Sequence, residues 1–143
     1  MRTFTFASVD ELPADFWKWP HVNPRTEWAC KGDGTLLVAP DFLDRFEALR
    51  ATYARPLVIT SGYRSPEYNL RVAHTGADGP HTTGHAADVA IATSHEAYRL
   101  AELAFRYGFQ GIGVSQRAGQ PRFVHLDDLP GDDNTPRPGL WSY

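Results

Sequence analysis

The spacing of apolar and polar residues predicts three helices in this chain. Between residues 40 and 53, apolar side chains recur every three or four positions with charged side chains between them, which is typical of an amphipathic helix. A second such run begins with a capping box at Thr93–Glu96 and stops near Gly108. A third, short helix is predicted from Ser65, an N-cap followed by proline, to about Val72.

Strands are predicted where β-branched residues cluster or where apolar and polar residues alternate. Residues 56–61 are a β-branched run, which predicts a buried strand, and residues 85–91 alternate. Residues 111–114 and 122–126 can pair as a hairpin, and residues 36–38 could form a further short strand. Helices and strands therefore occur together, and we expect an α+β fold with a small antiparallel sheet and packed helices.

The first 35 residues lack a sustained period and are rich in Trp and Pro. We expect residues 1–35 to form an irregular arm packed by its aromatic side chains, and residues 36–143 to form the core of a single domain. Two interpretations of the arm remain open at this point. It can be a lid over one end of the core, or its tryptophans can form a wall of a substrate groove.

Composition excludes several classes of protein. Lys and Arg number 14 against 17 Asp and Glu, a net charge of 14 − 17 = −3 with no basic block, so nucleic acid is not an expected partner. A single cysteine, Cys30, excludes an internal disulfide and a zinc site built from several cysteines. No apolar run approaches the roughly 18 residues of a membrane span, and the first residues lack the pattern of a secretion signal.

Two histidines and an aspartate stand in segments suited to hold one metal ion. His81 and Asp88 lie in the segment 79–89, and His125 lies in the segment 122–127. Alternation places Asp88 among small neighbours on one strand face, which leaves room for an ion. Imidazole and carboxylate suit Zn²⁺, and three protein ligands leave the fourth tetrahedral position open, as in catalytic zinc sites.

Three ordered motifs carry a resemblance to a known family. Ser-Gly-Tyr-Arg-Ser-Pro at 61–66 precedes His-x-x-Gly-x-Ala-x-Asp at 81–88, and Val-His-Leu-Asp follows at 124–127. The set resembles peptidase family M15, the zinc D-Ala-D-Ala peptidases, which share a metal-site fold with hedgehog domains and the LAS cell-wall peptidases and include phage endolysins. The resemblance implies one Zn²⁺ on His81, Asp88 and His125. It also implies that Arg64 binds a substrate carboxylate or the developing oxyanion, although a structural ion pair is the alternative role.

The acid or base of the reaction is not given by the motifs. Some relatives carry Glu three residues, or His two residues, before the last ligand, and here Arg122 and Phe123 stand there. Asp127 is the candidate base, because alternation on a strand places it on the same face as His125. The alternative is that Asp127 orients a ligand or closes a turn. The other histidines are expected to be surface or satisfied polar residues: His21, His74, His85 and His95.

The expected activity is hydrolysis of a peptidoglycan stem or cross-link peptide, by a D,D- or L,D-type carboxypeptidase or endopeptidase. A phage-type lysis enzyme, made in the cytoplasm and acting at the cell wall, fits this expectation, and a monomer is assumed. The alternatives are a wall-binding or virion protein that keeps zinc for stability alone, or a metallopeptidase for another small peptide. Metal content and the kinds of peptide that are cleaved would distinguish these alternatives.

Overall fold

The computed structural model describes residues 2–143 and has the α+β architecture predicted from the sequence. The larger sheet has five strands in the order β3-β4-β6-β5-β7, and a second sheet pairs β1 with β2. The strands are β1 (Phe4–Phe6), β2 (Leu36–Val38), β3 (Ile59–Ser61), β4 (Ala86–Ala90), β5 (Gly111–Ser115), β6 (Phe123–Asp127) and β7 (Gly139–Ser142). The α-helices are α1 (Pro40–Tyr53), α2 (Pro66–Val72) and α3 (Ser94–Arg106).

The helices begin where the sequence places their caps. Ser65 accepts a hydrogen bond from the backbone N–H of Tyr68 at the start of α2. At the start of α3, Thr93 and Glu96 form both halves of the predicted capping box. The start of α1 has proline in its first turn, where the missing N–H costs nothing.

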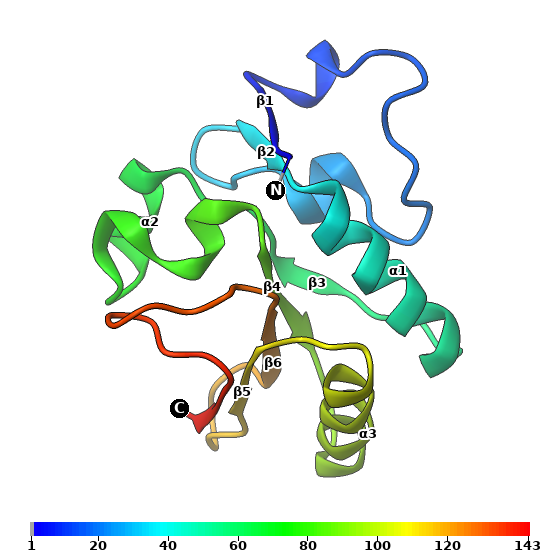
Figure 1. Ribbon diagram of the computed structural model, residues 1–143, viewed down its shortest axis with the longest axis vertical. Helices are drawn as coiled ribbons and strands as arrows, with labels where there is room; N and C mark the ends of the chain where they lie inside the picture. The colour runs from blue at the N-terminus through cyan, green and yellow to red at the C-terminus, as the bar shows by residue number, and fades with distance from the viewer. Residues whose placement is uncertain (1) are drawn as a thin grey trace.

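The helices α1 and α3 cover one face of the larger sheet, while α2 and the segment before β7 lie on the opposite side (Figure 1). Between the sheet and helices α1 and α3 lie apolar side chains from alternate positions of the strands. They include Ala87, Val89, Ile112, Val124 and Leu126. The alternate positions of the same strands point to the other face. The sheet thus has one face in the core and one face free to build a site.

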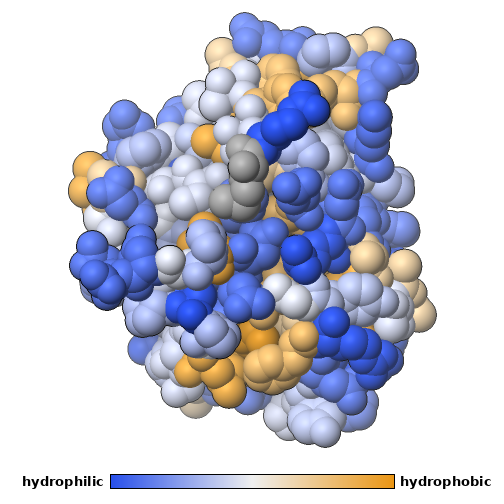
Figure 2. Space-filling view, viewed as in Figure 1, coloured by the Kyte–Doolittle hydropathy of each residue, from blue (hydrophilic) through white to orange (hydrophobic). Residues whose placement is uncertain are grey.

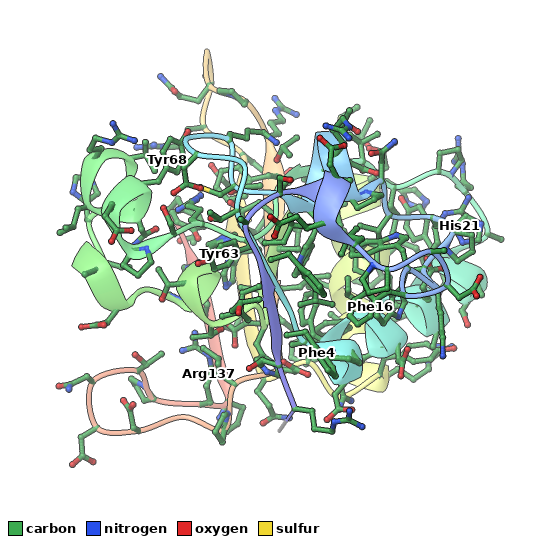
Figure 3. All side chains as sticks on the ribbon, turned by 90° about the horizontal axis from the view of Figure 1, so that it is seen from above. Phe4, Phe16, His21, Tyr63, Tyr68 and Arg137 are labelled. Carbon is green, nitrogen blue, oxygen red and sulfur yellow. The ribbon has the colours of Figure 1, made fainter. Side chains whose placement is uncertain are left out.

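The N-terminal arm is more regular than the sequence predicts. Strand β1 pairs antiparallel with β2, although no strand was expected before residue 36. Phe4 and Phe16 lie edge to face, with ring centroids 5.3 Å apart (Figure 3). The indole N–H of Trp28, a fully buried residue, donates to the carbonyl of Leu37 at 2.9 Å, which ties the arm to β2.

Two strands of the larger sheet differ from expectation. The run 56–61 forms only the three-residue β3, at the edge of the sheet. It is half-buried rather than buried, because alternation turns Leu57 and Ile59 to the core and leaves Val58 exposed. Strand β7 joins the other edge and runs parallel to β5, so the sheet is mixed rather than wholly antiparallel. Strand β7 carries the C-terminal aromatic residues onto the face opposite the core.

Hydrophilic residues dominate the face of the molecule that Figure 2 shows, and the largest apolar group on that face lies in its lower part. None of the helices within residues 2–143 has both the length and the apolar character that crossing a lipid bilayer requires.

Candidate metal centre

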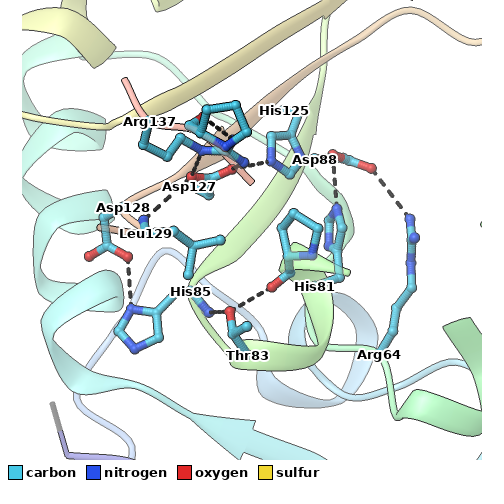
Figure 4. A network of polar contacts seen from close by, with 12 residues as sticks. Arg64, His81, Thr83, His85, Asp88, His125, Asp127, Asp128, Leu129 and Arg137 are labelled. Atoms are coloured by element: carbon cyan, nitrogen blue, oxygen red, sulfur yellow. Dashed lines mark hydrogen bonds and ion pairs between the residues drawn. The ribbon is translucent and has the colours of Figure 1, made fainter. Parts of the chain in front are cut away.

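Three buried side chains meet on the face of the sheet opposite the core. His81 lies on a 3-10 turn, η4 (Pro80–Thr83), Asp88 on β4 and His125 on β6. Antiparallel pairing sets Asp88 directly opposite His125. One ligand atom of each of the three residues lies within 4.8 Å of the other two (Figure 4). The structure therefore brings together the three residues that the sequence predicts as metal ligands.

The distances from Asp88 to the two histidine nitrogens suit a tetrahedral zinc ion. Asp88 Oδ1 lies 3.2 Å from His81 Nε2 and 3.0 Å from His125 Nδ1. Two ligand atoms bound tetrahedrally to zinc at their usual bond lengths are about 3.3 Å apart. Two imidazole nitrogens and one carboxylate also favour zinc over Ca²⁺ or Mg²⁺, which prefer oxygen ligands.

The second nitrogen of each histidine is held by a hydrogen-bond acceptor. His81 Nδ1 lies 2.8 Å from the carbonyl oxygen of Gly62, and His125 Nε2 lies 2.8 Å from Asp127 Oδ2. Each acceptor suits an N–H on the nitrogen that it faces, so with a metal ion bound His81 would carry its proton on Nδ1 and His125 on Nε2. The lone pairs of His81 Nε2 and His125 Nδ1, the nitrogens that face Asp88, would then be free to bind the ion.

The three predicted ligands differ in how readily they are protonated. Burial acts to raise the pKa of the Asp88 carboxyl, but the neighbouring His81 and His125 outweigh it and hold this pKa well below its ordinary value. Burial lowers the pKa of His81, so its imidazole is neutral at neutral pH. For His125, burial acts to lower the pKa, but the hydrogen bonds to Asp127 and Asp88 raise it.

Asp127 is fully buried and both of its oxygens have partners. Oδ2 accepts from His125, while Arg137 donates to Oδ1 from Nε at 2.8 Å and to Oδ2 from Nη2 at 2.6 Å. Burial acts to raise the pKa of Asp127, but these hydrogen bonds lower it to about 2. A carboxylate this acidic accepts protons weakly near neutral pH. Of the two roles that the sequence leaves open for Asp127, these contacts favour orientation of His125.

The guanidinium of Arg64 lies beside Asp88, with Nη2 at 3.5 Å from Oδ2. Its Nε donates to the hydroxyl of Ser61 at 2.9 Å, and its Nη1 donates to the side-chain oxygen of Asn69 at 3.1 Å. Asn69 in turn donates to the carbonyl of Gly76. Three partners thus fix the guanidinium at the edge of the metal centre, which is the place expected of a group that binds substrate.

A cleft of about 600 Å³ opens over the candidate metal centre. Arg64 and the three predicted ligands line it together with apolar side chains from α2, β6 and the C-terminal segment. These apolar residues include Val72, Phe123, Leu140 and Trp141. Among the described residues that line the cleft there is no arm tryptophan, so the structure agrees with the arm as a cover for the core rather than a groove wall.

The remaining histidines have separate environments. His85 is buried and contacts Asp128 through Nδ1 at 2.7 Å, while the exposed His21 contacts Glu47 through Nδ1 at the same distance. His21 has the surface polar role expected of it. His85 departs from expectation, because its buried Nε2 has no hydrogen-bond partner among the described residues. His74, by contrast, lines the cleft, which its sequence context did not indicate.

A sequence profile described as Peptidase M15 matches residues 18–127, which is most of the chain. The chain belongs to peptidase family M15. Comparison with curated proteins gave no match. Membership of the M15 family supports a peptidase, and the buried group of His81, Asp88 and His125 gives this M15 domain a place for a metal ion.

Two site residues escaped sequence reasoning because they follow the recognisable motifs. Arg137 and Trp141 lie beyond the profile match, within a tail of Asp, Pro and Gly that suggests only loop. Nothing local links Arg137 to a carboxylate ten positions earlier in the chain. That pairing depends on the parallel placement of β7 beside β5.

Proposed function

We propose that this M15 domain is a zinc-dependent peptidase that hydrolyses peptide bonds of bacterial peptidoglycan. One observation carries the proposal: His81, Asp88 and His125 are buried, oriented by their outer hydrogen bonds and gathered under an open cleft. Of the roles considered for an M15 domain, an open cleft above the ligands favours a catalytic site over a zinc site that serves stability alone.

The protein side chains have separate tasks in this proposal. His81 Nε2, His125 Nδ1 and the Asp88 carboxylate would hold the ion. When bound, zinc supplies a Lewis acid that polarises the scissile carbonyl and activates water near neutral pH. Arg64 carries a permanent, forked positive charge at the edge of the cleft, suited to a substrate carboxylate or to the oxyanion that develops during attack.

The cleft supports a short peptide as the substrate. Its apolar walls can pack against small side chains such as alanine, while Arg64 offers a charge for a carboxylate. Peptidoglycan stem peptides combine these features, so we propose a D,D- or L,D-type carboxypeptidase or endopeptidase. A phage endolysin or a bacterial wall enzyme would use the same site.

Metal content and wall digestion test this function together. We expect wild-type protein to carry about one zinc ion per chain by plasma mass spectrometry, and His125→Ala to lose it. The matched control is His95→Ala, because His95 is exposed on α3 and should leave the zinc content unchanged. Purified peptidoglycan should yield new peptide termini with wild type and not with His125→Ala.

The outcomes separate the alternatives. Wild type that binds no zinc, even when zinc is supplied and the excess removed, contradicts the proposal. Zinc binding without cleavage of peptidoglycan or muropeptides leaves a zinc-stabilised binding protein. Cleavage of ordinary L-dipeptides in preference to muropeptides would assign the chemistry to another substrate.

A further inference from the structure

The segment after the profile match returns to the metal centre. The match ends at Asp127, but residues 128–138 loop out and β7 comes back to pair with β5. Register sets Gly139 opposite Gly111 and Trp141 opposite Gly113, on the same sheet face as His125. The C-terminal segment therefore packs against a predicted ligand rather than against the core.

Arg137 is the charged contribution of this segment. Arg137 donates two hydrogen bonds to Asp127, of 2.8 Å and 2.6 Å, and both side chains are almost wholly buried. Asp127 Oδ2 also accepts from His125 Nε2 at 2.8 Å. A chain of contacts thus runs from Arg137 through Asp127 to the imidazole whose other nitrogen faces Asp88 (Figure 4).

The neighbouring strand is shaped around this chain. A Cβ on Gly111 would lie 2.3 Å from Asp127 Oδ2 and 2.5 Å from Arg137 Nε, so any larger residue there would displace the ion pair. A Cβ on Gly113 would lie 2.3 Å from Trp141 Nε1. The two glycines on one face of β5 therefore leave space for the Arg137–Asp127 pair and for the indole.

Trp141 packs beside His125 and Arg137 and lines the cleft. Its ring centroid lies 5.3 Å from that of His125, and the guanidinium carbon of Arg137 lies 5.0 Å from the indole centroid. A guanidinium over an aromatic face is stabilised by the ring quadrupole. The indole and the carboxylate together confine Arg137 to one orientation.

We propose that Arg137 is a positioning residue for the metal centre, which acts through Asp127 to hold His125 with Nδ1 directed at the ion. The proposal rests on the proposed zinc function. Arg137 matches the fork of the carboxylate and stops its rotation, so that one oxygen stays aimed at His125 Nε2. Without Arg137, Asp127 would be a buried carboxylate with His125 as its remaining charge partner, and its orientation would relax.

A double-mutant cycle tests the proposal through zinc affinity, measured by competition with a chromophoric chelator. We expect Arg137→Gln to weaken zinc binding by about 10-fold, and Asp127→Asn by 10- to 100-fold, as is usual when partners of metal ligands are changed. The double variant should bind no more weakly than Asp127→Asn, because Arg137 acts through that carboxylate. Arg137→Lys, which keeps the charge without the fork, should fall between wild type and Arg137→Gln.

The matched control is Arg45→Gln. Arg45 contacts Asp128, the carboxylate next along the chain, at 3.6 Å, but on the side of His85. This variant should lose thermal stability and keep wild-type zinc affinity. A second readout is the His125 Nε2 proton in the zinc-loaded protein, which should exchange faster with water in Arg137→Gln than in wild type or Arg45→Gln.

The outcomes distinguish this proposal from the proposed function. Wild type without zinc defeats both. Zinc-binding wild type with unchanged affinity in folded Arg137→Gln, or additive losses in the double variant, overturns the role of Arg137 alone. If Arg137→Gln does not fold, Arg137→Lys provides the test. The proposal is overturned if Arg137→Lys has both the zinc affinity and the His125 Nε2 proton exchange rate of the wild type.

Discussion

At the scale of single residues, Arg64 illustrates how a side chain is prepared for a ligand. Ser61 and Asn69 accept from Nε and Nη1, which fixes the plane of the guanidinium before any substrate arrives. Nη2 lies 3.5 Å from Asp88, so the group touches the metal centre but retains donors that face the cleft. An arginine held in this way loses little freedom on binding.

Replacing Arg64 by Lys should separate substrate binding from metal binding. We expect kcat/KM on a muropeptide to fall at least 10-fold, because an ammonium cannot reproduce the forked contact, while zinc content stays at the wild-type level. Steady-state kinetics and metal analysis check both parts. Arg71→Lys is the control, since Arg71 lies on the neighbouring helix α2 and stacks on Tyr68. Equal losses in the two variants would contradict a role for Arg64.

Site residues could be predicted from the sequence where residue types suited to one chemistry occur at the spacing of a known motif. His81, Asp88 and His125 were found from ordered motifs, and the structure gathers them within 4.8 Å. The partner of Asp127 could not be found in this way. A salt bridge between residues 127 and 137 depends on the path of an irregular loop, and the sequence carries no periodic signal for such a path.

At the scale of elements, local signals predicted the helices and missed strands β1 and β7. The helices α1 and α3 follow from apolar spacing and caps, which act within a few residues. Strands β1 and β7 have three and four residues and are defined by partners far along the chain. Propensity in so short a stretch is too weak to fix the pairing, and tertiary contacts decide it.

The capping box of α3 gives a prediction at this scale. Thr93→Ala should lower the free energy of unfolding by about 1 kcal/mol, because the backbone N–H of Glu96 loses its acceptor. Ser94→Ala is the control, since Ser94 is already within the helix. Urea unfolding of the two variants measures the difference. Equal stability of both variants would show that the cap contributes nothing.

Glu96, the acidic residue of the same capping box, should affect how the free energy of unfolding depends on pH. Hydrogen bonds from the Ala92 and Thr93 backbone lower the pKa of Glu96 from 4.5. Because the pKa of Glu96 is lower in the folded state than in the unfolded state, its ionised carboxylate stabilises the fold at pH values above the unfolded-state pKa. This stabilisation is lost as the pH falls below about 4.5. Glu96→Gln should therefore flatten the loss of stability on acidification, as measured by urea unfolding from pH 7 to pH 3.

At the scale of the whole molecule, the metal centre joins segments that are distant in sequence. Its proposed contributors come from η4, β4, β6 and the loop before β7, with Arg64 supplied by the segment between β3 and α2. An ion bound at their meeting point favours the folded state over any state in which they separate.

Zinc should therefore raise the thermal stability of the protein. With free zinc at about 100 times its Kd, linkage gives about 3 kcal/mol, which corresponds to a rise in Tm of about 5–10 °C for a chain of this size. Chelation should reverse the rise, and calorimetry measures it. His81→Ala should show no response, whereas a response equal to that of wild type would place the ion elsewhere.

The alternation of side chains in β4 and β6 has a consequence for how this fold can change in evolution. Odd and even positions of the same strand serve two different environments, one apolar and one ionic. Substitution can alter one environment and leave the other intact. The loss or gain of a single residue within β6 cannot, because the shift of register would send Val124 and Leu126 into the cleft and His125 into the core. Length variation in this domain should therefore be confined to its loops.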